Sequence, residues 1–207
     1  MIKPEEAPEL SFPAECFDVW DWNGIDVTKE SLWRDGQQHK DTVQARAARH
    51  FIDAGYDVVF DDDAAGEAAD LICFKIDEET IHFSLVHCKF SENIGGARLQ
   101  DAVEVCSQAV RSGRWLWKFK DLCRHIAKRE QRLRSVIRPT RFLHGGSHEM
   151  NNILRASRFK EIQGQIIIVQ PGISRENHSE RQATILAAAH SFLTDTVGVP
   201  LDVVCAE

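Results

Sequence analysis

The segment that most constrains the fold is 69–90, which contains two apolar runs separated by a charged turn. The first run is ADLICFKI (69–76), the second is TIHFSLVHCKF (80–90), and the turn between them is DEE. Short apolar runs bounded by charged residues are typical of adjacent strands. We therefore predict a hairpin here, and the run YDVVF at 56–60 adds a third strand just before it.

Helical patterns flank these strands. Residues 42–54 carry apolar side chains at helical spacing, and Gly55 follows as a stop. A second helix is expected from 97 to about 111. Its apolar stripe is Leu99, Val103, Cys106 and Val110. A short strand, an Ala-rich helix and a last strand are expected at 165–170, 179–196 and 201–205. This order predicts an α/β protein with a mixed sheet flanked by helices.

The chain is predicted to consist of an N-terminal arm and one larger domain. Residues 1–40 contain three prolines and three tryptophans without a regular pattern, which is typical of an arm that packs on its own domain or on a neighbour. Residues 41–207 hold the regular elements. A basic helical insertion is expected within them at about 111–141.

This basic insertion contrasts with the acidic chain around it. The formal net charge is −7, yet residues 111–141 contain eleven basic residues (Lys or Arg) and only two acidic ones, Asp121 and Glu130. Because local potential steers a polyanion, we expect this segment to bind nucleic acid, with Trp115, Trp117 and Phe119 available for stacking. The expected contact residues are Arg111, Arg114, Lys118, Lys120, Arg124, Lys128, Arg129, Arg132 and Arg134. The alternatives are a solvated basic helix with core aromatics, or a surface that docks on an acidic partner.

Cysteine usage and hydropathy bear on the compartment. The six cysteines are scattered without a CxxC pair, which favours reduced thiols in a cytoplasmic protein and argues against structural zinc. No apolar run approaches the roughly 18 residues needed to span a membrane, and no signal segment opens the chain. We therefore expect a cytoplasmic protein without membrane association.

A group of polar residues is expected where the predicted strands meet. Side chains alternate between the faces of a strand, so His87 and Lys89 point the same way at the end of 80–90, and Asp70 opens the partner strand. Cleavage of a phosphodiester needs a divalent ion to activate water, and carboxylates are its hard oxygen ligands. A lysine beside them can orient the water and offset transition-state charge. The grouping therefore indicates a metal-dependent phosphodiesterase site.

Asp70, a gap of 16 residues and then His87-x-Lys89 on an apolar strand, with a helix before and a helix after, resembles the PD-(D/E)xK nuclease superfamily. The resemblance covers roughly 41–111 and implies a restriction-endonuclease-like fold. It also implies a DNA-cutting hydrolase, an endonuclease or an exonuclease, that uses Mg²⁺ or Mn²⁺; RNA remains an alternative substrate. The segments FDDDAAGEAADLI, HCKF and DAVEVCSQAVRSG look like nuclease segments joined to bacterial defence helicases. That likeness implies antiphage defence or DNA processing, with a helicase or another defence subunit as a partner.

The resemblance assigns roles residue by residue. Asp70 matches the metal-binding acid and Lys89 the catalytic lysine. At position 87 the superfamily has Glu, Asp or sometimes Gln, so His87 departs from the pattern. A neutral imidazole nitrogen suits Mn²⁺ better than Mg²⁺. Glu67, three residues before Asp70, can supply the missing carboxylate, so the expected metal ligands are Asp70, Glu67 and His87.

Gln108 completes the expected catalytic group of Asp70, His87, Lys89 and Glu67, and a second glutamine, Gln44, is of interest on the first helix. Gln108 is expected opposite the apolar stripe of its helix, facing solvent or the substrate groove. Gln44 resembles the polar residue that the first helix of such folds aims at the site. Asp61, Asp62 and Asp63 are interpreted as a charged turn.

His87 leaves a second function open, a catalytically inactive nuclease-fold module that binds nucleic acid or a partner subunit. In that case Asp70 would only cap a strand, and Lys89 would be a charge that protects a sheet edge from aggregation. We expect a working site, because burying an acid and a lysine in apolar surroundings is costly unless the charges are used.

Overall fold

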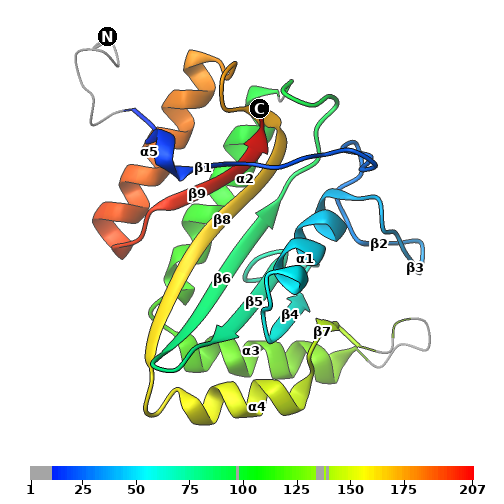
Figure 1. Cartoon of the computed structure of the whole chain (residues 1–207), viewed down its shortest axis with the longest axis vertical. Coiled ribbons are helices and arrows are strands. Elements are labelled where there is room, and N and C mark those ends of the chain that lie inside the picture. Colours follow the sequence, from blue (N-terminus) through cyan, green and yellow to red (C-terminus); the bar gives the residue numbers. More distant parts are fainter. Residues whose placement is uncertain (1–10, 97, 134–137, 139) are drawn as a thin grey trace.

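The computed structural model describes residues 11–96, 98–133, 138 and 140–207. In this part of the chain a seven-stranded sheet has the order β1-β9-β8-β6-β5-β4-β7 (Figure 1). Its strands are β1 (Phe17–Val19), β4 (Val58–Asp61), β5 (Leu71–Ile76), β6 (Thr80–Cys88), β7 (Phe142–His144), β8 (Glu161–Ser174) and β9 (Leu201–Ala206). The α-helices are α1 (Val43–Asp53), α2 (Leu99–Ser112), α3 (Phe119–Arg132), α4 (Ser147–Ala156) and α5 (Glu180–Val197). Short elements are the 3-10 helices η3 (Ala14–Cys16) and η4 (Gly113–Trp115) and the hairpin β2 (Trp33–Arg34) and β3 (Gln37–Gln38).

The predicted hairpin is the centre of the sheet. β5 and β6 pair antiparallel from Leu71 opposite Val86 to Ile76 opposite Ile81, and β4 pairs antiparallel with β5. On its other side β6 pairs parallel with β8, which pairs parallel with β9. The expected α/β architecture, a mixed sheet flanked by helices, is therefore confirmed.

The two faces of β6 are covered by different helices. Phe83 and Leu85 belong to a core cluster with Val105 of α2, whereas Val86 belongs to a second cluster with Phe51 of α1. Figure 1 shows α1 on the near face of the sheet and α2 behind it. Strand alternation therefore places His87 and Lys89 on the α2 face.

α2 turns a different stripe toward the sheet from the one expected. Its buried apolar residues are Ala102, Val105, Cys106 and Ala109. Leu99 and Val103, by contrast, are each 37% exposed. The observed stripe shares Cys106 with the expected one, and Val110 packs partly buried against the core. It is otherwise rotated about the helix axis, because small alanines allow the helix to pack close to the sheet. The rotation leaves Gln108 half-buried instead of opposite the packed face.

Residues of the N-terminal arm pack on this sheet. β1 pairs parallel with β9 at one edge. Trp20 and Trp22 are buried in the cluster that contains α1, and Trp22 Nε1 donates to Cys205 O at 3.2 Å. The arm therefore covers an edge and part of a face of the sheet.

Two further findings concern the cysteines and the helices. All six cysteines are buried and free. No helix in the described ranges has the length and apolar character needed to cross a membrane.

Candidate functional site

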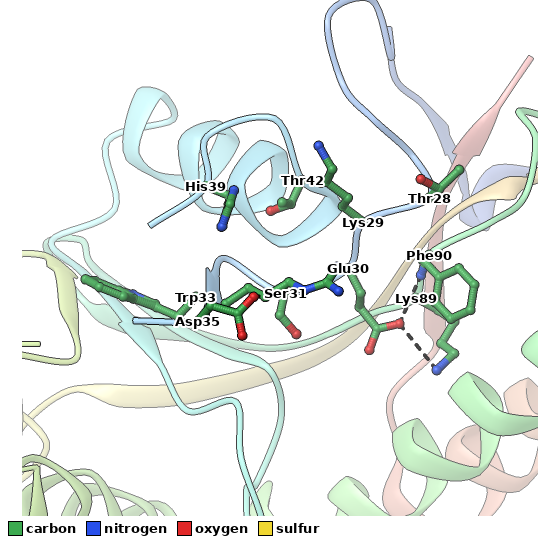
Figure 2. Close-up of a pocket in the computed structure, with 11 residues that line it drawn as sticks. Thr28, Lys29, Glu30, Ser31, Trp33, Asp35, His39, Thr42, Lys89 and Phe90 are labelled. Atoms are coloured by element: carbon green, nitrogen blue, oxygen red, sulfur yellow. Dashed lines mark hydrogen bonds and ion pairs between the residues drawn. The ribbon is translucent and has the colours of Figure 1, made fainter. Parts of the chain in front are cut away.

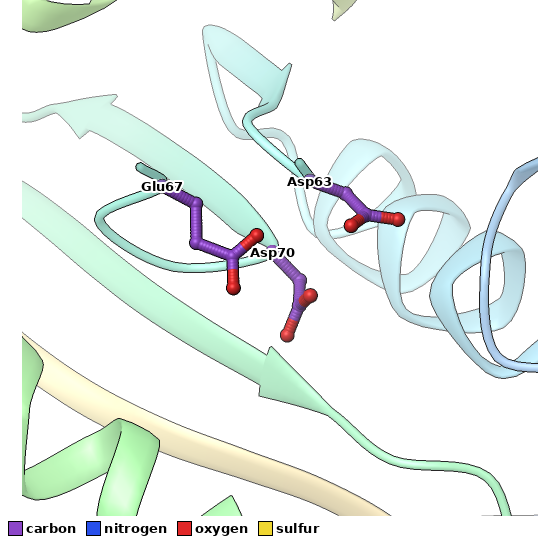
Figure 3. Close-up of side chains that lie close together, drawn as sticks. All are labelled: Asp63, Glu67 and Asp70. Atoms are coloured by element: carbon purple, nitrogen blue, oxygen red, sulfur yellow. The ribbon is translucent and has the colours of Figure 1, made fainter. Parts of the chain in front are cut away.

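Three carboxylates converge where β5 begins. Asp63 and Glu67 come from the loop between β4 and β5, and Asp70 directly precedes β5. One oxygen of each lies within 4.8 Å of an oxygen of the other two (Figure 3). Asp70 is buried and the other two are half-buried. Within the described residues, this acidic cluster is the group of His, Cys, Asp and Glu side chains that could hold a metal ion.

Gln44 of α1 orients two members of the acidic cluster. Its Nε2 donates to Asp63 Oδ2 at 3.1 Å and to Asp70 Oδ1 at 3.3 Å, while its Oε1 accepts from Leu32 N at 2.8 Å. The second oxygen of Asp70 accepts from Cys88 N at 2.8 Å. Because Gln44 is fully buried, it holds both carboxylates in place before any ligand arrives. The first helix thus directs Gln44 at the acidic cluster, which is the place that the resemblance implied for it.

The acidic cluster is electrostatically strained without a positive charge. Burial raises the pKa of Asp70 well above its ordinary value, and the charges of Glu67 and Asp63 raise it further against the Cys88 hydrogen bond. Burial also raises the pKa of Glu67. A bound cation would favour the ionised carboxylates and reverse both shifts.

The loop that carries the cluster is clamped by residues of α3. Asp62 has no exposed side-chain surface, and its Oδ1 accepts from Arg129 Nε at 2.7 Å. His125 Nε2 lies 2.7 Å from the other oxygen. Asp61 is also buried, and burial raises its pKa to about 6. The interpretation of this segment as a charged turn is therefore wrong, since two aspartates are internal and Asp63 belongs to the acidic cluster.

His87 lies beside the acidic cluster but outside its group of convergent oxygens. Its Nδ1 is 4.0 Å from Asp70 Oδ2, and neither ring nitrogen has a hydrogen-bond partner in the described part of the chain. Burial, together with the charge of Arg111, lowers the pKa of His87 to about 3, so the ring is neutral. It faces a pocket that Glu67, Gln108 and Arg111 also line.

Lys89 is held between two carboxylates on the α2 face. Its Nζ lies 3.0 Å from Glu104 Oε1 of α2 and 3.3 Å from Glu30 Oε2 of the arm. Burial alone would lower the pKa of Lys89, but the hydrogen bond to Glu104 and the charge of Glu30 raise it. Glu30 also accepts from Phe90 N at 3.1 Å (Figure 2). Glu30, Lys89 and Phe90 line a pocket of about 590 Å³, most of whose other lining residues, Trp33 among them, come from the arm.

Sequence patterns missed three acidic residues of this region: Asp63, Glu30 and Glu104. Glu104 had a usable signal, because it precedes Gln108 by one helical turn and so shares its side of α2. Asp63 and Glu30 lie in irregular segments, where no periodicity indicates the direction of a side chain.

The expected nucleic-acid surface divides into two groups of basic residues. Exposed are Arg111, Arg114, Lys118, Lys120, Arg124, Lys128 and Arg132. Arg129 is instead committed to Asp62, with only 13% of its side chain exposed. Arg134 lies outside the described residues. Among the aromatic residues, Phe119 belongs to the core, and Trp115 is half-buried and lines a pocket. Trp117 is 75% exposed, so its ring is the most accessible of the three.

No protein-family model, no curated protein and no solved structure matches the chain. The chemistry of the site is therefore inferred from the side chains described above.

Proposed function

We propose that the chain is a metal-dependent nuclease of the PD-(D/E)xK superfamily, with a restriction-endonuclease-like fold, that hydrolyses DNA phosphodiester bonds. The observation that carries the proposal is the acidic cluster at the start of β5, next to the end of β6 where Lys89 lies. Leu71 pairs with Val86, so Asp70 and Lys89 lie at the same end of the hairpin. Antiphage defence or DNA processing, with a helicase or another defence subunit as partner, is the setting that the sequence resemblance implies.

The donor set of the acidic cluster fits a hard divalent cation such as Mg²⁺ or Mn²⁺. Asp63, Glu67 and Asp70 offer only carboxylate oxygens, which are the ligands that these ions prefer. A cation held there would polarise a phosphoryl oxygen and lower the pKa of an attacking water. Gln44 keeps Asp63 and Asp70 oriented for this purpose.

Lys89 contributes positive charge to the reaction. Its pKa is raised, so the ammonium group is protonated at neutral pH and cannot serve as a general base. It is suited instead to stabilising negative charge that develops on the phosphoryl oxygens. Glu30 and Glu104 hold it in position at the end of β6.

The exposed basic residues of α3 and of the turn before it supply contacts to the DNA backbone. Lys118, Lys120, Lys128 and Arg132 are exposed, and Trp117 presents its ring among them. Phosphate neutralisation by such side chains gives affinity without sequence preference.

Plasmid cleavage tests the proposal. The protein should nick or linearise supercoiled DNA with Mg²⁺ or Mn²⁺ and should be inactive in EDTA. Asp70→Asn should be inactive with either ion, because asparagine has nearly the same shape as aspartate but lacks the negative charge that binds the cation. Asp53→Asn, at an exposed position of α1, is the matched control and should cut like the parent. Cleavage by Asp70→Asn at the parental rate would exclude the acidic cluster as the catalytic centre.

A second candidate function is a nuclease-derived module that binds nucleic acid or a partner subunit without cutting. Two observations favour it: His87 occupies the position of the superfamily's second carboxylate, and Lys89 is already paired with two glutamates. Such a module would bind DNA equally well with EDTA or Mg²⁺ and would leave the plasmid supercoiled in both.

A further inference from the structure

A second pocket opens beside the acidic cluster, under the end of α2, with a volume of about 370 Å³. Glu67 belongs to both the cluster and this pocket. The other side chains that matter are His87 at the end of β6, Gln108 and Arg111 of α2, and Arg114 and Trp115 of η4. We call it the His87 pocket.

The floor of the His87 pocket carries polar atoms that lack partners. Within the described residues, both ring nitrogens of His87 and Oε1 of Gln108 are buried without a hydrogen bond. His87 is only 2% exposed. Buried polar groups are nearly always hydrogen-bonded, because an unpaired one costs free energy. A neutral imidazole offers one donor and one acceptor, and an amide oxygen accepts. A complementary occupant therefore presents a donor to Gln108 Oε1 and a donor or an acceptor to His87.

Charges of both signs line the His87 pocket. Arg111 and Arg114 are exposed, whereas Glu67, whose carboxylate the pocket shares with the acidic cluster, is half-buried. An anion would be repelled by Glu67 and attracted by the two arginines. Trp115 adds an aromatic surface that suits a flat ring. A neutral heterocycle with an attached phosphate matches this arrangement.

We propose that the His87 pocket receives one unpaired nucleobase, whose neighbouring phosphate is held by Arg111 and Arg114. This inference rests on the proposed function, since the same strand would continue over the acidic cluster that Glu67 shares. A base inside a duplex is paired and stacked and cannot enter a pocket unless it is flipped out. The protein therefore prefers single-stranded or frayed nucleic acid to an intact duplex.

Binding measured in EDTA tests the pocket independently of cleavage. Fluorescence anisotropy compares a labelled single strand of mixed bases with an abasic strand of equal length and with a blunt duplex. The parent should bind the base-containing strand most tightly. Gln108→Leu should weaken that binding about fivefold, the effect of one lost hydrogen bond, and leave abasic binding unchanged. Arg111→Gln should weaken binding of both strands and lower the log–log salt slope by about 0.7.

Gln100→Leu is the matched control, because it makes the same change at an exposed position of α2 and should bind like the parent. Equal affinity of the parent for the abasic and base-containing strands overturns the inference. An equal loss on both strands in Gln108→Leu also overturns it. Mn²⁺ binding that is lost in His87→Phe and retained in Asp70→Asn would assign the pocket to a metal ion instead. Base-dependent binding without cleavage in Mg²⁺ or Mn²⁺ supports the pocket and refutes the proposed nuclease.

Discussion

Replacing Arg129 by Ala removes the guanidinium that clamps the loop between β4 and β5. Its Nε donates to Asp62 Oδ1 at 2.7 Å and its Nη1 to Ala65 O at 3.0 Å. Loss of one partner from a buried ion pair typically costs about 3–5 kcal/mol, because the other charge stays buried and unpaired. His125 Nε2 remains 2.7 Å from the Asp62 carboxylate. We therefore expect the free energy of unfolding to fall by about 3 kcal/mol, the lower end of that range.

Urea unfolding followed by circular dichroism measures this loss. Arg132→Ala is the matched control, because Arg132 is exposed one turn later on α3, and it should change the free energy of unfolding by less than about 0.5 kcal/mol. Calorimetric titration of Arg129→Ala with Mn²⁺ should also show weaker binding, since the loop that carries Asp63 and Glu67 is no longer fixed. An Arg129→Ala protein as stable as Arg132→Ala would refute the reasoning. Arg129 would then again be a candidate contact for nucleic acid.

Other expected outcomes concern the site, its protonation and the basic surface. Lys89→Ala should abolish plasmid cleavage. The circular dichroism spectrum should not change, because the two carboxylates that pair with Lys89 are partly exposed and can be hydrated in the variant. Cleavage at the parental rate would exclude Lys89 from the chemistry. The pKa of Asp70 is raised above its unfolded value, so the metal-free folded state binds the extra proton. Stability from this group is therefore present at low pH and lost as the pH rises through the folded pKa. Urea unfolding at about pH 5 and about pH 8 should show the parent losing stability relative to Asp70→Asn at the higher pH; a constant difference would contradict the shift. Lys128→Ala and Arg132→Ala should each lower the log–log salt slope of duplex binding by about 0.9, and an unchanged slope would place these residues off the DNA path.

The sequence predicted those elements whose pattern is local. The β5–β6 hairpin alternates so regularly that its strands, its turn and the faces of its side chains could all be predicted. β8 was predicted only at 165–170, although it spans Glu161–Ser174. Its first residues are polar because that end is partly exposed, and its later Pro171-Gly172 resembles a turn. Pairing of β1 with β9 depends on contacts between opposite ends of the chain, which no local pattern encodes.

In the candidate site, too, residues on regular strands could be predicted, whereas residues placed by distant contacts could not. Asp70 and Lys89 could be found because they lie at the ends of regular strands. Asp63 could not, because it lies in a loop held by contacts with distant residues: Arg141 Nη1 donates to Asp63 O at 3.2 Å, and Arg129, 67 residues from Asp62 in the chain, donates to the Asp62 carboxylate. The sequence also made Arg129 look like a nucleic-acid contact, since its buried partner is visible only in the folded structure.

Two tasks, binding the cation and contacting the substrate, fall to neighbouring groups in the superfamily pattern. The residue at position 87 indicates that different parts of the proposed nuclease perform them. In that pattern a carboxylate stands two residues before the lysine, whereas here a loop residue, Asp63, brings the third carboxylate within 4.8 Å of the others. In the proposed nuclease, the position on β6 would then not be needed to bind the metal ion. A neutral His87, with its pKa lowered to about 3 by burial and by Arg111, adds no negative charge beside an approaching phosphate. In the proposed nuclease, the loop therefore binds the cation and the strand contacts the substrate, so histidine at this position is compatible with an active enzyme.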